Sequence, residues 1–452
     1  MDAEVDVVVL GAGMAGLTAA LVAQESGART LCLEKEDEPG GSLAISGGYV
    51  WTVDSVEDYL ALSPEGDLTL GRIVVEDLPT GIEWLADHGV ELLAVASGIG
   101  AGRAFGGHRI RPDPVSGAVT PLVQAYLAAG GQLVTRASVT DLVLGERGEV
   151  DGIRYRDRAG AHDVACRAVV IATGGFQGDQ AMLGTFFGPW ADRAYLRSGP
   201  GSTGDGVRLA FGAGAAASKG MSSFYGHLFP APPADLDPSS FRGLTQFYSE
   251  ACILLNKAGQ RFVDESRGDE ICALRLLQQE EATGFIVFDE TRHQHEVSEP
   301  YVPDATRTDP LPGVRAAGGA VLQADTIPEL CQQLHERYDV PPARAAATIQ
   351  EFDEAARKGD AGLLRVPRRH DLHTCEAAPF YAVPVRPGIT FTEGGVRVNE
   401  DCAALDRGGR PIPGLFIAGA DVGAVSIEGY VGGLAAALVT GLRAGINAAP
   451  EQ

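Results

Sequence analysis

Residues 5–35 read VDVVVLGAGMAGLTAALVAQESGARTLCLEK, and this stretch decides the fold of the chain. Residues 5–10 form a short apolar run, which predicts a strand buried on both faces of a parallel sheet. Three glycines follow at the spacing GxGxxG. In this motif Gly11 allows a tight turn, Gly13 lets the backbone approach a pyrophosphate, and Gly16 lets the next helix pack closely on the sheet.

The residues after the glycines complete the motif. A helix that starts near Met14 points N–H groups and the positive end of its dipole at the phosphates. A second strand, Thr30 to Leu33, ends at Glu34, whose carboxylate can accept the ribose hydroxyls. The motif follows a strand, opens a helix and meets an acid, so it predicts a dinucleotide site. The alternative is a glycine-rich turn that binds nothing.

Closely spaced small residues continue beyond the acid. Residues 39–42 read PGGS and residues 46–49 read SGGY, which lets the backbone approach a second large planar group and favours a flavin over a nicotinamide. Farther along, residues 168–175 (AVVIATGG) predict a strand that ends in glycines, and residues 415–421 (LFIAGAD) predict one that ends in an acid.

With Gly204-Asp205-Gly206 between them, these segments resemble the FAD-binding half of the fumarate reductase and succinate dehydrogenase flavoprotein superfamily over nearly the whole chain. The resemblance implies an α/β fold, in which an inserted α+β capping domain interrupts a Rossmann-like FAD-binding domain. In that superfamily the acids that match Asp205 and Asp421 contact FAD, and the segment that matches residues 430–436 starts a helix aimed at the flavin ring. Turn and capping roles are the alternative for both acids.

We expect FAD to be bound non-covalently, because residues 34–51 contain no histidine. The residues expected at the cofactor are Gly11, Gly13, Met14, Ala15, Gly16, Glu34, Lys35, Gly40, Gly41, Ser42, Ser46, Gly47, Gly48, Val139, Ala172, Thr173, Gly174, Asp205, Gly419, Asp421, Gly433, Ala435 and Ala436.

Length and composition bound the remaining possibilities. A chain of 452 residues favours two domains, and we expect residues 1–225 and 370–452 to form the FAD-binding domain and residues 226–369 the capping domain. Helices are expected over 55–89, 269–282, 341–358 and 432–448, and strands over 132–144, 150–156 and 284–288. A net charge of -24 repels phosphate backbones, so nucleic acid is not an expected partner.

The seven cysteines contain no CxxC pair, so no metal, iron–sulfur or c-type haem site is expected. The amino-terminal residues are acidic, and no apolar run reaches the roughly 18 residues of a membrane span. We therefore expect no secretory signal, no membrane span and a cytoplasmic location. We expect no second strand-GxGxxG-helix unit and therefore no separate NAD(P)H-binding domain, and the external electron donor or acceptor stays unknown.

Candidate catalytic residues come from the same resemblance. Residues 259–267 (GQRFVDESR) resemble the stretch in which an arginine delivers a proton, and Arg267 is the match. Arg261, or a structural ion pair with Glu265, is the competing interpretation. His227 falls where fumarate reductases have a substrate-contacting histidine, although a lone histidine is more often structural.

Two positions depart from the fumarate reductases. Phe391 stands where they have a substrate-binding histidine, and Tyr430 replaces the arginine that clamps the distal carboxylate. This change removes a fixed charge, so fumarate and succinate are poor candidates. The arrangement Tyr-x-Gly-Gly at 430–433 is similar to ketosteroid dehydrogenases and oxocyclohexane desaturases. There the matching tyrosine and a backbone N–H, here that of Leu434, polarise a ketone like an oxyanion hole.

These features predict an FAD-dependent oxidoreductase that acts on a carbon–carbon bond next to the carbonyl of a small molecule, as a desaturase or an ene-reductase. A reductase or dehydrogenase of small carboxylic acids and a non-catalytic flavin-binding subunit are the alternatives. Tyr225 and Tyr248 are both available as a base. The candidate residues are Arg267, Tyr430, His227 and Glu250 for catalysis, and Tyr225, Phe391, Glu393 and Leu434 for substrate binding.

Overall fold

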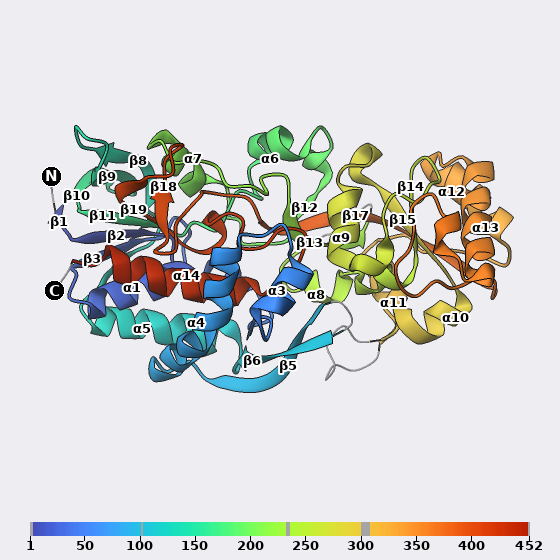
Figure 1. Ribbon diagram of the computed structural model, residues 1–452, viewed down its shortest axis with the longest axis horizontal. Coiled ribbons are helices and arrows are strands. Elements are labelled where there is room, and N and C mark those ends of the chain that lie inside the picture. Colours follow the sequence, from blue (N-terminus) through green and yellow to red (C-terminus); the bar gives the residue numbers. More distant parts are fainter. Residues whose placement is uncertain (1–2, 101–102, 232–235, 300–307, 451–452) are drawn as a thin grey trace. The chain divides into compact units, whose positions relative to one another are not determined.

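The computed structural model describes residues 3–100, 103–231, 236–299 and 308–450. The chain divides into two compact units, each described by itself. The first unit contains residues 1–182, 198–224 and 391–452, and the second contains residues 183–197 and 225–390. The predicted α/β class is confirmed, because a parallel Rossmann-like sheet lies in the first unit and a separate mixed α+β unit interrupts it (Figure 1).

The central sheet of the first unit has six strands in the order β18-β19-β11-β2-β3-β7. These strands are β2 (Val7–Leu10), β3 (Thr30–Leu33), β7 (Gln132–Val134), β11 (Ala168–Ile171), β18 (Ala403–Leu405) and β19 (Pro411–Ile417). All pairs are parallel except β18 with β19. Every residue of β2, β3 and β11 is buried, as their continuous apolar sequences predict.

Helices α1 (Met14–Glu25) and α14 (Gly433–Ala448) lie side by side against this sheet (Figure 1). Small residues permit the close approach: a Cβ on Gly441 would stand 2.6 Å from the carbonyl oxygen of Ala15. The other helices of this unit are α2 (Gly41–Ala44), α3 (Val56–Leu62), α4 (Leu68–Asp87), α5 (Thr120–Ala128) and α7 (Asp205–Gly212). The single helical stretch expected over 55–89 is therefore two helices, since Asp67 caps the second with its side chain.

Two smaller sheets complete the first unit. One has the order β1-β10-β9-β8 and the other β4-β6-β5. Their strands are β1 (Ala3–Glu4), β8 (Ser138–Leu144), β9 (Val150–Asp157), β10 (Gly160–Ala165), β4 (Tyr49–Trp51), β5 (Leu92–Gly100) and β6 (Arg103–Ile110). The β5–β6 hairpin was not predicted from the sequence.

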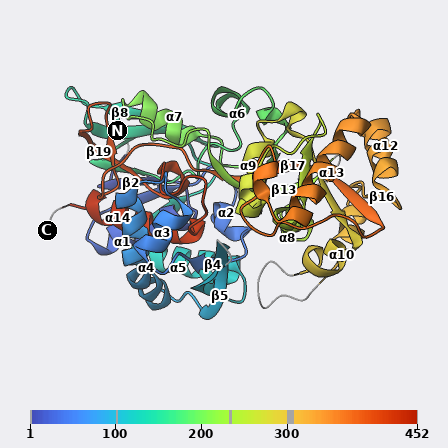
Figure 2. The same ribbon diagram turned by 45° about the vertical axis from the view of Figure 1, so that its right-hand side comes forward.

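The second unit contains a sheet of order β12-β17-β15-β14, with β13 and β16 also paired to β17. Its strands are β12 (Tyr195–Leu196), β13 (Phe224–Pro230), β14 (Ile253–Asn256), β15 (Gly284–Asp289), β16 (Leu322–Ala324) and β17 (Phe380–Thr392). The helices are α6 (Gln180–Phe187), α8 (Phe241–Leu244), α9 (Asp269–Leu276), α10 (Glu290–Arg292), α11 (Leu311–Ala316), α12 (Ile327–Tyr338) and α13 (Pro342–Lys358). Figure 2 shows α12 beside α13. The core of this unit includes Phe285 and Phe352.

Two expected boundaries differ from the structure. The helix expected over 269–282 ends at Leu276, and a 3-10 turn follows in which Glu281 has φ 56°. Residues 370–390, expected in the first domain, belong to the second unit, because β17 pairs with β15 from Gly284 to Asp289. Part of the proline-containing run at 229–238 lies outside the described residues.

All seven cysteines are buried as thiols. In the part of the chain that the structure describes, no helix combines the length and the apolar character needed to cross a bilayer.

Candidate active site

The glycine-rich turn of the first unit fits the predicted motif. Gly11 has φ +97°, and a Cβ there would lie 2.4 Å from the carbonyl oxygen of Ala172. A Cβ on Gly16 would lie 1.8 Å from the carbonyl oxygen of Gly11. Packing therefore requires both glycines. At Gly13 the nearest atom to a Cβ would be the oxygen of Gly40 at 3.7 Å, so a glycine here leaves room that the protein itself does not use.

Glu34 lies at the carboxyl end of β3 with its carboxylate held by backbone. Its Oε2 accepts a hydrogen bond from the N–H of Ala12 at 2.8 Å, and Oε1 accepts one from the N–H of Glu36 at 2.9 Å. Each carboxylate oxygen has a further lone pair for a hydroxyl donor. The acid is thus fixed next to the glycine turn, where the motif requires it.

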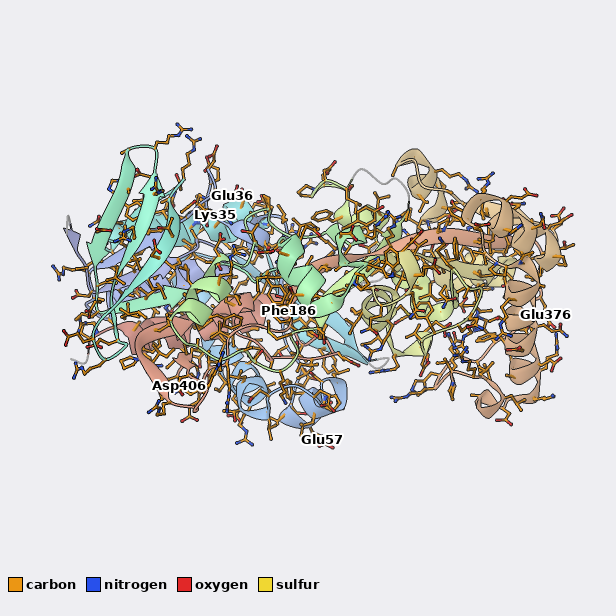
Figure 3. The ribbon with its side chains drawn as sticks, turned by 90° about the horizontal axis from the view of Figure 1, so that it is seen from above. Lys35, Glu36, Glu57, Phe186, Glu376 and Asp406 are labelled. Atoms are coloured by element: carbon orange, nitrogen blue, oxygen red, sulfur yellow. The ribbon has the colours of Figure 1, made fainter. Side chains whose placement is uncertain are left out.

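Two residues expected at the cofactor form an ion pair. Lys35 Nζ lies 2.7 Å from a carboxylate oxygen of Asp205, in the first turn of α7, and 2.6 Å from Thr203 Oγ1. Partial burial would raise the pKa of Asp205, but the hydrogen bond and the charge of Lys35 together with Arg208 lower it. Figure 3 shows Lys35 and Glu36 side by side.

Asp421 shapes the turn after β11. Its fully buried carboxylate accepts hydrogen bonds from the N–H groups of Thr173, Gly174 at 3.0 Å and Gly175 at 3.2 Å. Burial raises its pKa against these hydrogen bonds. The structure therefore brings together the expected residues at 172–174 and 419–421, and the contacts of Asp421 are those of a turn-holding acid.

The glycines of residues 40–48 also adopt backbone conformations, or make close backbone contacts, that a side chain would disturb. Gly40 has φ +125° and Gly48 has φ +72°. A Cβ on Gly41 would come within 3.7 Å of Gly13 Cα, so these two backbones face each other with little between them. Ser42 Oγ accepts from the N–H of Gly199 at 3.1 Å. These backbone cradles, the acid at the end of β3 and the helix starts fit FAD. The remaining expected residues are Met14, Ala15, Ser46, Gly47, Val139, Gly433, Ala435 and Ala436, and Met14, Ala15, Gly433, Ala435 and Ala436 lie in the first turns of α1 and α14.

Tyr430 lies immediately before α14 in an aromatic setting. Its hydroxyl oxygen accepts a hydrogen bond from the N–H of Gly433 at 3.2 Å. The indole of Trp51 meets its ring edge-on at a centroid distance of 5.3 Å, and Phe391 lies at 6.3 Å. Phe391 also limits Gly433, where a Cβ would stand 3.0 Å from the phenyl ring. Tyr430, Phe391 and Leu434, expected as substrate residues, therefore share one neighbourhood.

Glu393, also expected to bind substrate, is buried next to this segment. Its carboxylate accepts from Ser223 Oγ and from the N–H of Glu428 at 3.0 Å, and Ser426 Oγ lies at 3.4 Å. Burial raises its pKa to about 7.

In the second unit, His227 lies between an acid and a phenol. Its Nδ1 is 2.5 Å from a carboxylate oxygen of Asp269, and its Nε2 is 2.9 Å from the hydroxyl of Tyr225. His227 and Asp269 are each 1% exposed. Burial and the charge of Arg197 lower the pKa of His227 to about 3, while burial raises that of Asp269. The imidazole is therefore uncharged at neutral pH.

Two further acids lie near this pair. Burial and the charge of Asp269 raise the pKa of Glu270 to about 8. Desolvation and the charge of Glu270 raise the pKa of Glu250 to about 7, an effect that the exposure of its side chain weakens. Single ligand atoms of His227, Asp269 and Glu270 lie within 4.8 Å of one another, a grouping that the sequence did not reveal. Both nitrogens of His227 are already engaged in hydrogen bonds.

The arginines of residues 259–267 have different surroundings. Arg261 is buried, and two of its nitrogens lie 2.9 Å and 2.5 Å from the oxygens of Glu265, which Arg368 also approaches at 3.3 Å. The structural ion pair considered for Arg261 is thus present. Arg267 ends the 3-10 turn Glu265–Arg267 and is exposed.

With this geometry in place, comparison with known proteins identifies the class. Residues 6–434 match the profile of the FAD binding domain family. The chain therefore belongs to this family, in the superfamily of the fumarate reductase and succinate dehydrogenase flavoproteins, and it binds FAD. It is an FAD-dependent oxidoreductase of the class that acts on CH–CH groups.

Individual relatives span two chemistries. The chain is 28% identical to NADH:fumarate oxidoreductase of Klebsiella pneumoniae (strain 342) over 98% of its own length and 47% of the relative's. It thus spans about half of that protein. It is 26% identical to 3-oxosteroid 1-dehydrogenase of Mycobacterium tuberculosis, with 92% of each chain covered. The crystal structure of 3-ketosteroid-delta4-(5alpha)-dehydrogenase from Rhodococcus jostii RHA1 has the same fold, with a TM-score of 0.76 at 23% identity and coverage of 100% and 98%.

Proposed function

We propose that this flavoprotein acts on a carbon–carbon bond next to a carbonyl group, by α,β-desaturation of a ketone or the reverse ene-reduction. The observation that carries the proposal is Tyr430: a phenol stands at the start of α14, and its oxygen accepts the N–H of Gly433. A hydroxyl that accepts a hydrogen bond becomes a stronger donor through its own proton. A phenol so prepared suits a neutral carbonyl oxygen better than a carboxylate.

Bound FAD supplies hydride acceptance or donation at the flavin ring. In our proposal, Tyr430 and the N–H of Leu434 hold the carbonyl oxygen where negative charge develops. Removing one donor of such a pair typically costs about 3 kcal/mol of transition-state stabilisation. The rings of Trp51 and Phe391 pack beside that of Tyr430, and such aromatic surroundings favour an apolar, ring-bearing substrate.

The proton at the neighbouring carbon needs a donor or an acceptor. Arg267 is the residue that the resemblance indicates. His227 has both ring nitrogens engaged and is 1% exposed, so we assign it a positioning role through Tyr225 instead of direct substrate contact. Glu250 is the candidate for a proton relay, since the pKa of its carboxyl is shifted upward, toward neutral pH.

An anaerobic flavin-bleaching screen tests the function. Purified holoenzyme is mixed with cyclic ketones or, after chemical reduction, with enones, and the flavin absorbance is followed. Rapid change with a ketone or enone, and none with fumarate or succinate, is the expected result. Bleaching or reoxidation by unsaturated acids alone would contradict the proposal and favour a fumarate-type reductase, the candidate that the Klebsiella relative supports. Indifference to both classes would favour a non-catalytic flavin-binding subunit.

The mode of FAD attachment has its own test. We propose non-covalent binding, so denaturation in acid should release all yellow colour into the supernatant. Flavin that stays with the precipitated chain would contradict this. The cytoplasmic location stays a prediction.

A further inference from the structure

A buried carboxylate, that of Glu393, contacts two separate segments of the first unit, one at Ser223 and one at residues 424–428, just before Tyr430. Glu393 is 5% exposed and directly follows the strand β17, which ends at Thr392. One of its carboxylate oxygens accepts from the Ser223 hydroxyl and from the N–H of Glu428. The backbone of Glu393 contacts the same two segments. Its N–H donates to the carbonyl oxygen of Ser223 at 3.0 Å, and its carbonyl oxygen accepts from the N–H of Ala424 at 2.7 Å.

The segment that Glu393 contacts is held in an unusual conformation. Glu428 has φ +55°, a value that costs free energy for any residue with a Cβ. A Cβ on Gly429 would stand 2.0 Å from the oxygen of Leu62, and one on Gly432 would stand 1.8 Å from the oxygen of Trp51. Such a conformation persists where surrounding contacts determine it, and the carboxylate of Glu393 supplies the contact to the N–H of Glu428 itself.

Ser223 and Phe391 also mark where the chain passes between its units. Residues 198–224 leave the first unit after Phe224, and the chain returns to it at Phe391. Glu393 therefore links two of the four points at which the chain passes between its units to the segment before Tyr430, within the first unit.

We propose that Glu393 is a positioning residue: its carboxylate fixes residues 426–430 so that the Tyr430 hydroxyl meets the N–H of Gly433. It acts through Tyr430 and does not contact the substrate. The catalytic consequence rests on the function proposed above, whereas the positioning of Tyr430 does not.

Trp51 provides a readout that is independent of turnover. Its ring is 3% exposed and lies 5.3 Å from the ring of Tyr430, so its emission reports on the place of the phenol. The chain has three tryptophans, and the double substitution Trp84→Phe with Trp190→Phe leaves Trp51 alone. In this holoenzyme background, Glu393→Ala should shift the emission and increase acrylamide quenching. Glu393→Gln keeps an acceptor for the Glu428 N–H and should stay close to the parent. Glu400→Gln removes a charge from an exposed residue of the same unit and is the matched control.

A double-mutant cycle tests the catalytic consequence. With Tyr430 intact, Glu393→Ala should lower kcat about tenfold, while in the Tyr430→Phe background it should cause little further loss, since coupled residues are non-additive. Unchanged Trp51 emission in Glu393→Ala would overturn the positioning role. Equal losses in both backgrounds would overturn its action through Tyr430. Full activity of Tyr430→Phe would instead contradict the proposed function. The Trp51 emission test would then still decide whether Glu393 positions Tyr430.

If Glu393→Ala does not fold, Ser223→Ala and Ser426→Ala remove its hydroxyl partners one at a time. Each should shift Trp51 emission in the same direction by a smaller amount. Absence of any shift in both variants would overturn the proposal.

Discussion

Helices α1 and α14 are each preceded by an N-cap glycine, Gly13 and Gly432, and neither helix has an acid in its first turn. Their approaches differ. The turn before α1 is built by Gly11, Gly13 and Gly16 within six positions of the sequence. The turn before α14 is held by residues far away along the chain: Thr52 Oγ1 donates to the oxygen of Val431 at 2.8 Å, and Ser63 Oγ accepts from the N–H of Ile427 at 2.7 Å.

This difference separates two tasks. An uncapped helix start with a bare backbone suits a phosphate, which needs N–H donors and room. A helix start with a phenol beside it suits a neutral oxygen in a chosen place. The start of α1 depends on residues that are close together in the sequence, whereas the start of α14 depends on tertiary contacts. Substitutions should therefore affect the two helix starts differently.

The largest effect is expected in the local turn. Gly16→Ala would place a methyl group about 1.8 Å from the oxygen of Gly11, which the backbone cannot accommodate without moving. We expect purified protein without flavin and with a lower midpoint of thermal unfolding, measured by absorbance and calorimetry. Gly212→Ala is the control, because no atom of the described residues comes within 4 Å of a Cβ there, apart from its own helix and chain neighbours. Normal flavin content in Gly16→Ala would show that the turn is not the nucleotide site.

Tyr430→Phe should affect the site at the start of α14 and leave the glycine turn at residues 11–16 unchanged. Loss of the hydroxyl should lower turnover roughly 100-fold or more, the usual effect of losing one oxyanion donor. Flavin content should stay at the parent level, because the glycine turn at residues 11–16 is untouched. Single-turnover flavin bleaching measures the rate. A variant that loses flavin and rate together would mean that the phenol supports cofactor binding instead.

Glu393→Gln should change how stability depends on pH. Burial raises the pKa of Glu393 to about 7 from an unfolded-state value of 4.5. Ionisation is thus disfavoured in the folded state, so wild-type stability from this group is complete below pH 4.5 and is lost as pH rises to about 7. Since each pH unit of this interval corresponds to about 1.4 kcal/mol, the variant should gain roughly 3 kcal/mol relative to wild type across it.

Urea unfolding of both proteins from pH 4.5 to 8 measures this difference. The other titrating groups near Glu393 are Glu428 and Tyr59, and both are present in each protein. A stability difference that stays constant with pH would contradict a raised pKa in the folded state.

The smallest effect is expected at Ser63. Ser63→Ala removes the hydroxyl that accepts from Ile427 N–H and donates to the Ile427 oxygen at 3.0 Å. Two buried backbone groups lose their partner, which should lower the free energy of unfolding by about 1–3 kcal/mol. Flavin content should not change. A wild-type unfolding curve would mean that the segment before α14 does not depend on this contact.

The sequence by itself determined the first half of this comparison. Residues 5–35 predict β2, α1, β3 and the acid at Glu34, and the structure has them, because each rests on contacts between near neighbours: apolar periodicity, glycine φ values and strand endings. The FAD binding domain and the presence of Tyr430 beside a glycine pair were likewise readable from local motifs.

Only the tertiary structure decided what surrounds those motifs. The sequence predicts that Glu393 binds substrate and that His227 orients it, and these roles stay predictions. The structure adds their hydrogen-bond partners, which are Ser223 and Glu428 for Glu393, and Asp269 and Tyr225 for His227. The structure also places β17 in the second unit, because β17 pairs with β15. These partners lie from two to 170 positions apart, and a buried polar group takes whichever donors packing brings to it. Spacing along a chain does not encode that choice.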